Sequence, residues 1–274
     1  MPERSEREGG HSEDQELAGR AALITGGAGA IGTAIARSLA AAGANIAIQD
    51  LRADAADQAV QAVRGYGVDS VACVGDVSSP EDIDSMFAAV QMRWGRIDIL
   101  VNNAGFQHVA PIEDYRLEIW RQMLDVHLTA AFLTTRAAIP SMKARRWGRL
   151  IYMSSINGKI GNAYKSAYCA AKHGLIGLAK TAALELAGHG ITSNAVCPGY
   201  AGTPMVRNQL ADLARHHGYG SDEEALERVL YPDVPQRRLI QPDEVAGLVA
   251  YLCLDRARGI TGQAINVSGG FVMH

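Results

Sequence analysis

The sequence predicts an α/β protein in which a parallel β-sheet is covered by helices on both faces. Short apolar runs alternate many times with longer alanine- and leucine-rich segments of helical periodicity, which is the pattern of successive right-handed crossovers. The apolar runs are continuous, as strands buried on both faces require. With 274 residues, 48% of them hydrophobic and 20% charged, the chain is long enough to build a large core.

Seven apolar runs are expected to be strands, and five longer segments have helical spacing. The expected strands are residues 21–25, 45–49, 70–74, 97–101, 149–153, 192–196 and 263–267. The expected helices are residues 31–42, 53–64, 81–94, 118–138 and 166–186. We therefore expect a single domain over residues 19–274.

Two segments depart from this alternation. Residues 1–18 hold six acidic residues and two arginines without periodicity, and we expect a disordered tail there. Residues 198–242 are rich in proline and glycine with helical material between them. We expect this segment to form a mobile helical substrate lid over the carboxyl ends of the strands.

Charge and cysteine content exclude several classes of function. The net charge is −3, and outside the acidic tail the chain is nearly neutral, which argues against a nucleic-acid partner. No long apolar segment predicts a signal peptide or a membrane span. Four cysteines, far apart and without metal-ligand spacing, predict reduced thiols in a cytoplasmic protein and no metal site; they are Cys73, Cys169, Cys197 and Cys253.

The first expected strand runs directly into a glycine-rich turn and a helix. Glycines permit a tight turn and let the backbone approach a pyrophosphate, and the helix N-terminus offers unpaired N–H groups. The alternative is a glycine-rich turn that binds no ligand. The position of this turn, directly after the first strand of a βαβ series, favours a dinucleotide site. The turn reads TGGAGAIG, and the expected cofactor contacts in it are Gly26, Ala30, Ile31 and Gly32.

An acidic residue ends the second strand. Asp50 lies 18 residues after Gly32, where a carboxylate can bind both ribose hydroxyls of NAD and repel the 2′-phosphate of NADP. Arg52 lies two residues further on and could instead accept that phosphate. We favour NAD as the cofactor.

Two further strand ends carry short polar residues. Asp76, followed by Val77, could accept a hydrogen bond from an adenine amino group or could simply cap a helix, and both interpretations stay open. The fourth strand ends in NNAG, in which Asn103 and Gly105 suit a backbone packed against a cofactor.

Three residues have the chemistry that hydride transfer requires. Tyr168 and Lys172 are four apart on one helix face, and Ser155 precedes Tyr168 by 13 residues. An unperturbed phenol has a pKa of ~10 and is a poor acid or base, but a nearby ammonium and a positive nicotinamide ring should lower that pKa. Ser155 can donate to the developing oxyanion. An amphipathic helix with an incidental Tyr and Lys is the alternative.

Taken together, these motifs resemble the short-chain dehydrogenase/reductase family over about residues 19–274. The resemblance implies a doubly wound (Rossmann), mostly parallel seven-stranded sheet, nicotinamide-dependent hydride transfer and a homotetramer. It implies that Tyr168 is the acid/base, that Ser155 binds the carbonyl oxygen and that Lys172 holds the nicotinamide ribose. Further implied cofactor contacts are Pro198, Gly199 and Thr203.

The chain departs from the family pattern at two positions. Ala30 stands where the family has its second glycine, which is a mild change. His127 stands where the family usually has an asparagine that anchors a water for proton relay. The histidine side chain could serve the relay, its backbone carbonyl could do so, or the side chain could have no catalytic role.

Within the family, several positions are similar to 3-hydroxybutyrate dehydrogenases. Those enzymes grip a carboxylate with a Gln, a Lys, a second Gln and usually a His, which correspond here to Gln107, Lys165, Gln209 and Asn157. Phe271 stands at a position near the C-terminus where these enzymes have an aromatic residue, usually a tryptophan. The resemblance implies that (R)-3-hydroxybutyrate, a small carboxylate-bearing alcohol, is oxidised to acetoacetate.

Two other functions remain open at this point. The same chemistry could act on another secondary alcohol, such as a 3-oxoacyl thioester, a cyclic diol, a sugar or a sterol. A regulator that binds NAD without turnover would be expected to lack Ser155, Tyr168 or Lys172, and all three are present.

Overall fold

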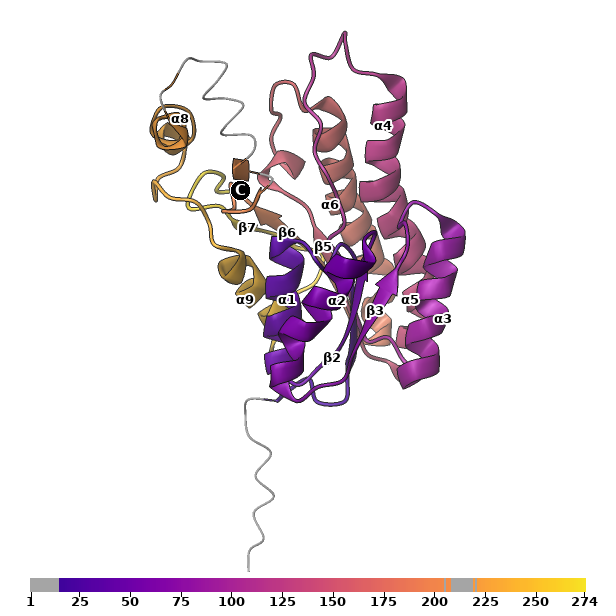
Figure 1. The fold of residues 1–274 in the computed structure, drawn as a ribbon. Helices are drawn as coiled ribbons and strands as arrows, with labels where there is room; N and C mark the ends of the chain where they lie inside the picture. The colour runs from indigo at the N-terminus through magenta and orange to yellow at the C-terminus, as the bar shows by residue number, and fades with distance from the viewer. Residues whose placement is uncertain (1–14, 205, 208–218, 220) are drawn as a thin grey trace, which may run out of the picture.

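Seven strands form one parallel sheet in the order β3-β2-β1-β4-β5-β6-β7 (Figure 1). The computed structural model describes residues 15–204, 206–207, 219 and 221–274. The chain builds outward from β1 to β3 and then returns to place β4 on the other side of β1. The strand order therefore reverses between β1 and β4, which is where doubly wound folds bind their ligands. The predicted fold class is confirmed.

Each predicted apolar run contains a strand, with ends that differ by a few residues. The strands are β1 Ala21–Ile24, β2 Asn45–Asp50, β3 Ser70–Val74, β4 Ile99–Asn102, β5 Gly148–Met153, β6 Ile191–Pro198 and β7 Ala264–Val267. All residues of β1, β4, β5 and β6 are buried. Continuous burial explains why these runs show no alternation of apolar and polar residues.

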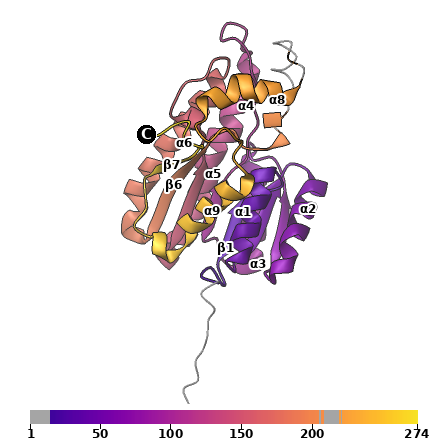
Figure 2. The same ribbon diagram turned by 90° about the vertical axis from the view of Figure 1, so that its left-hand side faces the viewer.

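Helices cover both faces of the sheet (Figures 1 and 2). One face carries α1 Ala30–Ala41, α2 Ala53–Val63 and α9 Pro242–Cys253; the other carries α3 Pro80–Trp94, α5 Ala130–Arg145 and α6 Ser166–Leu186. Successive residues of β1 alternate between the two layers, because Ala22 and Ile24 belong to the first core and Leu23 to the second. Two hydrophobic cores, one on each face, therefore hold the sheet in place.

The long helix predicted at 118–138 is divided in the structure. Helix α4 covers Leu117–Leu124, a π-helical turn covers Asp125–Thr129, and α5 continues to Arg145 with Pro140 inside it. Periodicity alone did not predict the π-helical turn, which adds one residue to a helical turn and is frequent at functional sites. The turn carries His127, whose side chain is buried.

Only part of the predicted lid lies within the described residues. It includes α8 Asp222–Ala225, a π-helical turn at Leu226–Leu230 and a 3-10 turn at Tyr231–Asp233. Leu230 is buried in a small apolar cluster of its own, separate from the two main cores. Helical material between the prolines agrees with the prediction, and a lid function stays a prediction.

The predicted tail is corrected at its last four residues. Of residues 1–18, the structure describes only 15–18. These form a turn in which Leu17 is 1% exposed and packs in the first core, and its backbone N–H donates to the Ala42 oxygen at 2.8 Å. Glu16 pairs with Arg256 at 3.0 Å. This part of the tail therefore belongs to the folded body.

Within the described part of the chain, no helix is both long and apolar enough to cross a membrane.

Candidate active site

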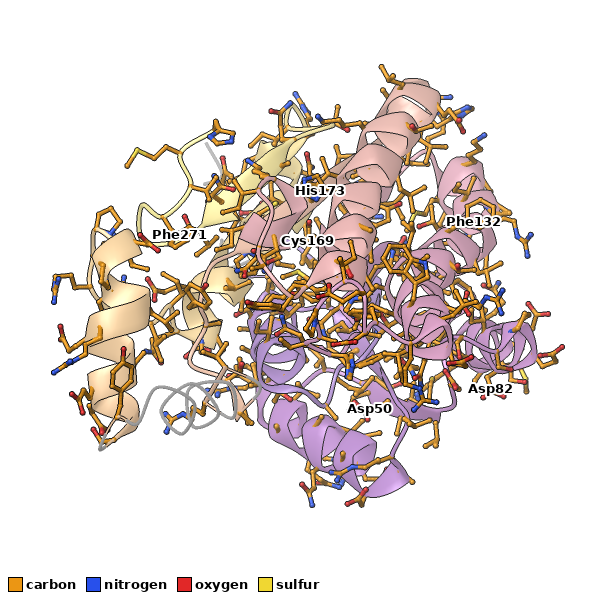
Figure 3. All side chains as sticks on the ribbon, turned by 90° about the horizontal axis from the view of Figure 1, so that it is seen from above. Asp50, Asp82, Phe132, Cys169, His173 and Phe271 are labelled. Carbon is orange, nitrogen blue, oxygen red and sulfur yellow. The ribbon has the colours of Figure 1, made fainter. Side chains whose placement is uncertain are left out.

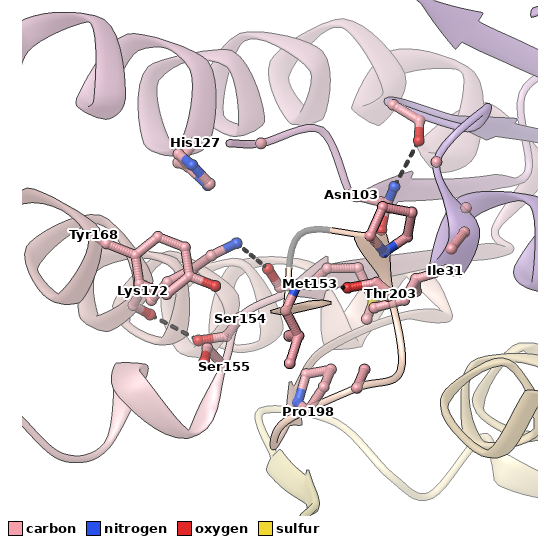
Figure 4. A pocket seen from close by; sticks show the side chains of 18 of the residues that line it. Ile31, Asn103, His127, Met153, Ser154, Ser155, Tyr168, Lys172, Pro198 and Thr203 are labelled. Carbon is pink, nitrogen blue, oxygen red and sulfur yellow. Dashed lines mark hydrogen bonds between the residues drawn. The ribbon is translucent and has the colours of Figure 1, made fainter. Parts of the chain in front are cut away.

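A cavity of about 380 Å³ opens at the carboxyl ends of the central strands (Figure 4). This volume lies within the usual range for small-molecule sites. Many of the predicted site residues line it: Gly26, Ala30, Ile31, Gly32, Asp50, Asn103, Gly105, His127, Ser155, Tyr168, Lys172, Pro198, Gly199 and Thr203. Residues far apart in the sequence thus meet at the point where the strand order reverses.

Two glycines of the turn after β1 have no room for a side chain. Gly26 has φ +58°, and a Cβ there would lie 2.7 Å from the Ala104 Cα. A Cβ on Gly32 would lie 2.6 Å from the Gly26 oxygen. Helix α1 begins directly after Gly29, its N-cap, and has no acidic residue in its first turn. Its first N–H groups and positive dipole end therefore face the cavity without a carboxylate of their own.

Hydrogen bonds from neighbouring strands fix this turn. Asn103 donates through Nδ2 to the backbone oxygens of Thr25 at 3.0 Å and Gly26 at 2.9 Å. Gln49 accepts from the Gly26 N–H at 3.0 Å and donates to the Gly75 oxygen at 2.7 Å. Sequence analysis missed Gln49 and Thr25. A polar residue buried within an otherwise apolar strand, as Gln49 is, is the signal that could have found it.

Asp50 ends β2 beside the glycine turn and lines the cavity. Its carboxylate accepts from the N–H groups of Ala28 at 3.2 Å and Arg52 at 3.3 Å. The Arg52 guanidinium lies 3.6 Å from the Asp54 carboxylate, and both side chains are 69% exposed. Asp50 therefore presents negative charge to the cavity, while Arg52 has a carboxylate partner in α2.

Asp76 and Val77 are not among the residues that line the cavity. The Asp76 carboxylate accepts from the backbone N–H of Ser78 at 2.8 Å and from its hydroxyl at 2.7 Å, and Val77 is buried. Asp76 is thus engaged in the turn before α3, whose helix N-cap is Ser79, and the contact with an adenine amino group stays a prediction.

The residues present fit a nicotinamide dinucleotide. The two glycines let the turn and the start of α1 pack closely together, and the free end of α1 suits a pyrophosphate. Asp50 lies at the end of the neighbouring strand, where it can reach ribose hydroxyls. These residues would hold the cofactor, and Lys172 and Thr203 line the same cavity.

Ser155, Tyr168 and Lys172 come together on one wall of the cavity (Figure 4). Ser155 caps the short 3-10 turn after β5, and its hydroxyl is hydrogen-bonded to Tyr168. Lys172 donates to the Met153 oxygen at 2.7 Å, and its Nζ lies 5.4 Å from the centre of the Tyr168 ring. The wall therefore offers a hydroxyl, a phenol and an amine to one bound substrate.

Close packing of the serine turn on α6 fixes this wall. The Ser154 hydroxyl donates to the Lys172 oxygen at 2.8 Å. A Cβ on Gly158 would lie 2.3 Å from the Ser154 Oγ and 2.7 Å from the Lys172 oxygen. Gly158, which sequence analysis did not single out, therefore allows the turn to approach the helix.

The expected lowering of the Tyr168 pKa is not found in the protein alone. Burial raises the pKa of the Tyr168 phenol to about 12, against the opposing hydrogen bond from Ser155. Burial also lowers the pKa of Lys172 to about 7. The prediction relied on two positive charges, and the chain supplies only the lysine. Lys172 is itself only 5% exposed, so desolvation also disfavours its charged form. Desolvation of the two groups therefore outweighs the attraction between an ammonium and a phenolate.

His127 is held by the backbone next to Gly105. Its Nε2 lies 3.1 Å from the Phe106 nitrogen and 2.8 Å from the Phe106 oxygen, and its buried Nδ1 has no hydrogen-bond partner. A Cβ on Gly105 would lie 2.2 Å from the imidazole Cε1, so this glycine makes room for the ring. The imidazole meets the Tyr168 ring edge-on at 5.5 Å. Burial, with Lys172 nearby, lowers the pKa of His127 to about 3.

Three of the four residues predicted for a substrate carboxylate, Gln107, Asn157 and Lys165, are not among the residues that line the cavity. Lys165 begins α6, one turn before Tyr168. Asn157 is 5% exposed, and its Oδ1 has no partner. Gln107 follows the strand end that carries Gly105. Gln209 lies outside the described residues.

Comparisons with known proteins give the same family over nearly the whole chain. A family model described as enoyl-(acyl carrier protein) reductase, within the short-chain dehydrogenase/reductases, matches residues 26–272. An uncharacterized oxidoreductase of Bacillus subtilis, YxjF, is 46% identical over 250 residues, which are 91% of this chain and 97% of that protein.

Two further relatives are named D-beta-hydroxybutyrate dehydrogenase. The protein of Rhizobium meliloti is 43% identical over 254 residues, covering 92% of this chain and 98% of its own. The protein of Cupriavidus necator is 42% identical over 256 residues, which are 93% of this chain and 99% of that protein. This chain therefore belongs to the short-chain dehydrogenase/reductase family and is a nicotinamide-dependent oxidoreductase that acts on CH–OH groups.

Proposed function

We propose that this enzyme oxidises (R)-3-hydroxybutyrate to acetoacetate, with NAD as the cofactor. The observation that carries the proposal is the environment of Lys165. Burial lowers the pKa of this lysine, and among the described residues no carboxylate forms an ion pair with it. A partly buried cation without a carboxylate partner is costly unless an anion is supplied. Similarity to two proteins named D-beta-hydroxybutyrate dehydrogenase supports a carboxylate as that anion.

The wall of Ser155, Tyr168 and Lys172 supplies the proton chemistry. In this proposal the Ser155 hydroxyl donates to the substrate oxygen, and the Tyr168 oxygen takes the hydroxyl proton as the ketone forms. The Lys172 ammonium favours the ionised phenol and binds the ribose. A bound nicotinamide cofactor supplies the hydride acceptor and, in its oxidised form, a positive charge.

The surroundings of Asp50 support NAD rather than NADP. A carboxylate beside the glycine turn would hydrogen-bond two ribose hydroxyls and repel a 2′-phosphate. Arg52, the residue that could offset this repulsion, lies beside Asp54 at 3.6 Å.

We also infer that the enzyme is a cytoplasmic homotetramer. Free thiols at all four cysteines fit a reducing compartment. Large apolar side chains are exposed on the helices of one layer, Phe132 by 49% and Leu184 by 86%, and a partner copy would cover them. Sedimentation of the purified protein at the mass of four chains supports this assembly, and a monomer contradicts it.

The proposed reaction is tested by initial rates of NADH or NADPH formation. The substrates are (R)-3-hydroxybutyrate, its S enantiomer and butan-2-ol, a neutral secondary alcohol of the same chain length. We expect the R enantiomer and NAD to give the highest kcat/KM. A higher kcat/KM with NADP would overturn the cofactor assignment.

A pair of lysine variants tests the carboxylate site. Lys165→Met should raise KM for (R)-3-hydroxybutyrate about 10- to 100-fold, since a charge-assisted hydrogen bond contributes about 1.5–3 kcal/mol. Its effect on butan-2-ol should be small. Lys180→Met, on the exposed face of the same helix, is the control. Equal losses on the acid and the neutral alcohol would contradict a carboxylate role.

A further inference from the structure

Tyr200 lies where the end of β6, the start of α6 and the C-terminal segment meet. Its ring contacts Phe271 edge-on, with centroids 5.8 Å apart and planes at 86°. Figure 3 shows Phe271 in the C-terminal segment. Its hydroxyl is hydrogen-bonded to the Asn162 side chain. Its backbone oxygen accepts from the Ile240 N–H at 2.9 Å. Phe271 and Asn162 therefore hold the side chain, and the bond from Ile240 holds the backbone of Tyr200.

The face of this fixed ring is directed to Lys165. The lysine Nζ lies 6.0 Å from the centre of the Tyr200 ring, which is the outer limit of a cation–π contact. The backbone N–H of Lys165 also donates to the backbone oxygen of Asn162 at 3.3 Å. Asn162 therefore contacts both the lysine backbone and the tyrosine hydroxyl. The lysine and the aromatic ring are thus parts of one small assembly.

Little else in the described structure determines where the Lys165 ammonium points. A lysine side chain has four rotatable bonds and loses entropy when it is held in one place. No carboxylate among the described residues orients it. An aromatic face attracts a cation through its quadrupole, and the attraction grows as water is removed. The Tyr200 ring can therefore select one direction for the ammonium.

We propose that Tyr200 is a positioning residue that holds the Lys165 ammonium ready for the substrate carboxylate. Phe271 supports the ring from the side, and Asn162 fixes its hydroxyl. The proposal rests on the carboxylate role of Lys165 put forward above. It assigns to Tyr200 an effect on the binding of anionic substrates, exerted through the lysine, and no part in the proton transfer.

The test is a double-mutant cycle between positions 200 and 165. Tyr200→Leu keeps an apolar side chain and removes the ring, and it should raise KM for (R)-3-hydroxybutyrate about five- to tenfold with kcat nearly unchanged. Tyr200→Phe keeps the ring and is the matched control, with a KM within about twofold of the original. In the Lys165→Met background, Tyr200→Leu should add nothing, because the group that it positions is gone.

Three outcomes would overturn the proposal. They are an unchanged KM in Tyr200→Leu, an equal rise of KM for butan-2-ol, and a further rise in the Lys165→Met background. If Tyr200→Leu does not fold, Tyr200→Met takes its place, since it keeps more of the volume without the ring.

A readout that does not use activity separates this proposal from the proposed reaction. Lys165 is labelled with acetic anhydride, and the modified peptide is quantified by mass spectrometry. Loss of the ring removes an attraction for the charged amine, so more of the amine is neutral and labelling should be several-fold faster in Tyr200→Leu than in Tyr200→Phe. Faster labelling with no turnover of 3-hydroxybutyrate would reject the substrate and keep the pairing. Equal labelling in the two variants would reject the pairing.

Discussion

Tyr168 and Lys172 share one wall of the cavity, and desolvation acts on both in favour of the neutral form. The pKa of the phenol rises to about 12 and that of the amine falls to about 7. Burial thus favours the neutral amine, so the charge of Lys172 depends on its surroundings. The positive charge that a phenolate requires therefore depends on what else is bound beside these two groups.

Replacement of the phenol by a ring without a hydroxyl tests its role directly. Tyr168→Phe should lower kcat by about 10²- to 10⁴-fold, which is the usual contribution of a positioned acid or base. Cofactor binding, followed by fluorescence titration, should change little because the ring remains. Tyr164→Phe, whose side chain is 61% exposed, is the control and should keep full activity. A kcat for Tyr168→Phe within threefold of this control would exclude the phenol from the reaction.

His127 makes the folded state sensitive to acid. Its pKa is about 3 when folded, against an ordinary value of 6.5, so between these pH values the unfolded chain binds a proton that the folded chain does not. Stability should therefore fall as the pH drops from 6.5 toward 3, by up to about 1.4 kcal/mol per pH unit. We interpret the ring as a neutral support for Phe106 and not as a carrier of protons.

The acid sensitivity is measured by urea unfolding between pH 4 and 7. His127→Asn removes the titrating ring and should flatten the fall in unfolding free energy over this range. His173→Asn, at an exposed position on α6, should leave the slope as it is. Parallel curves for the original protein and His127→Asn would contradict this account.

At the scale of elements, the junction of β1 and α1 is the most tightly constrained part of the site. The turn must pass under Ala104 at Gly26 and let α1 start close to it at Gly32. Hydrogen bonds from Gln49 and Asn103, at the ends of the two neighbouring strands, hold the turn in this shape. The cofactor cradle is thus a property of three adjacent strands as well as of the glycine turn.

Addition of one methyl group at this junction should separate the helix from the turn. In Gly32→Ala the new Cβ would lie 2.6 Å from the Gly26 oxygen, and we expect a loss of about 1–3 kcal/mol in the free energy of unfolding, as for other overpacked positions, with weaker cofactor binding. Gly29→Ala is the control for stability, because its Cβ would be 3.4 Å from the same oxygen. Both are measured by urea unfolding, and equal stabilities would refute the steric argument.

At the scale of the whole molecule, two cores on opposite faces of the sheet depend on contacts between distant segments. The first core includes Leu17, which precedes β1, and residues of α9, which precedes β7. Near the start of β1, the buried carboxylate of Asp98 accepts from the Ala21 N–H at 2.9 Å and pairs with Arg96 at 2.6 Å. Residues just before the first strand are thus tied to the centre of the fold.

Leu17 should contribute as a core residue even though its neighbours toward the N-terminus are charged. Leu17→Ala should lower the free energy of unfolding by about 2–4 kcal/mol, in the range of large-to-small core substitutions. Leu51→Ala, at a position 68% exposed, should change it by less than about 0.5 kcal/mol. A loss in Leu17→Ala no larger than in this control would show that the segment at 15–18 does not pack in solution.

Residues whose chemical type is required by the reaction or by local backbone geometry could be predicted from the sequence. Gly26 and Gly32 are required by the lack of space for a side chain, and Asp50, Tyr168 and Lys172 line the cavity, while their chemical roles stay predictions. Gln49 and Gly158 were missed, because their importance comes from partners on other elements. For Asp76 the sequence left two interpretations open, and its carboxylate accepts hydrogen bonds from Ser78 in the turn before α3.

By itself, the sequence determined the layers of the fold, the glycine turn and the spacing of Ser155, Tyr168 and Lys172, because periodicity and motif spacing are properties of neighbouring residues. Only the tertiary structure decided how deeply Tyr168 is buried, that Phe106 holds His127 and that Lys165 faces Tyr200. Desolvation and contact depend on the distance between segments that are far apart along the chain. That distance is set by the packing of helices on both faces of the sheet.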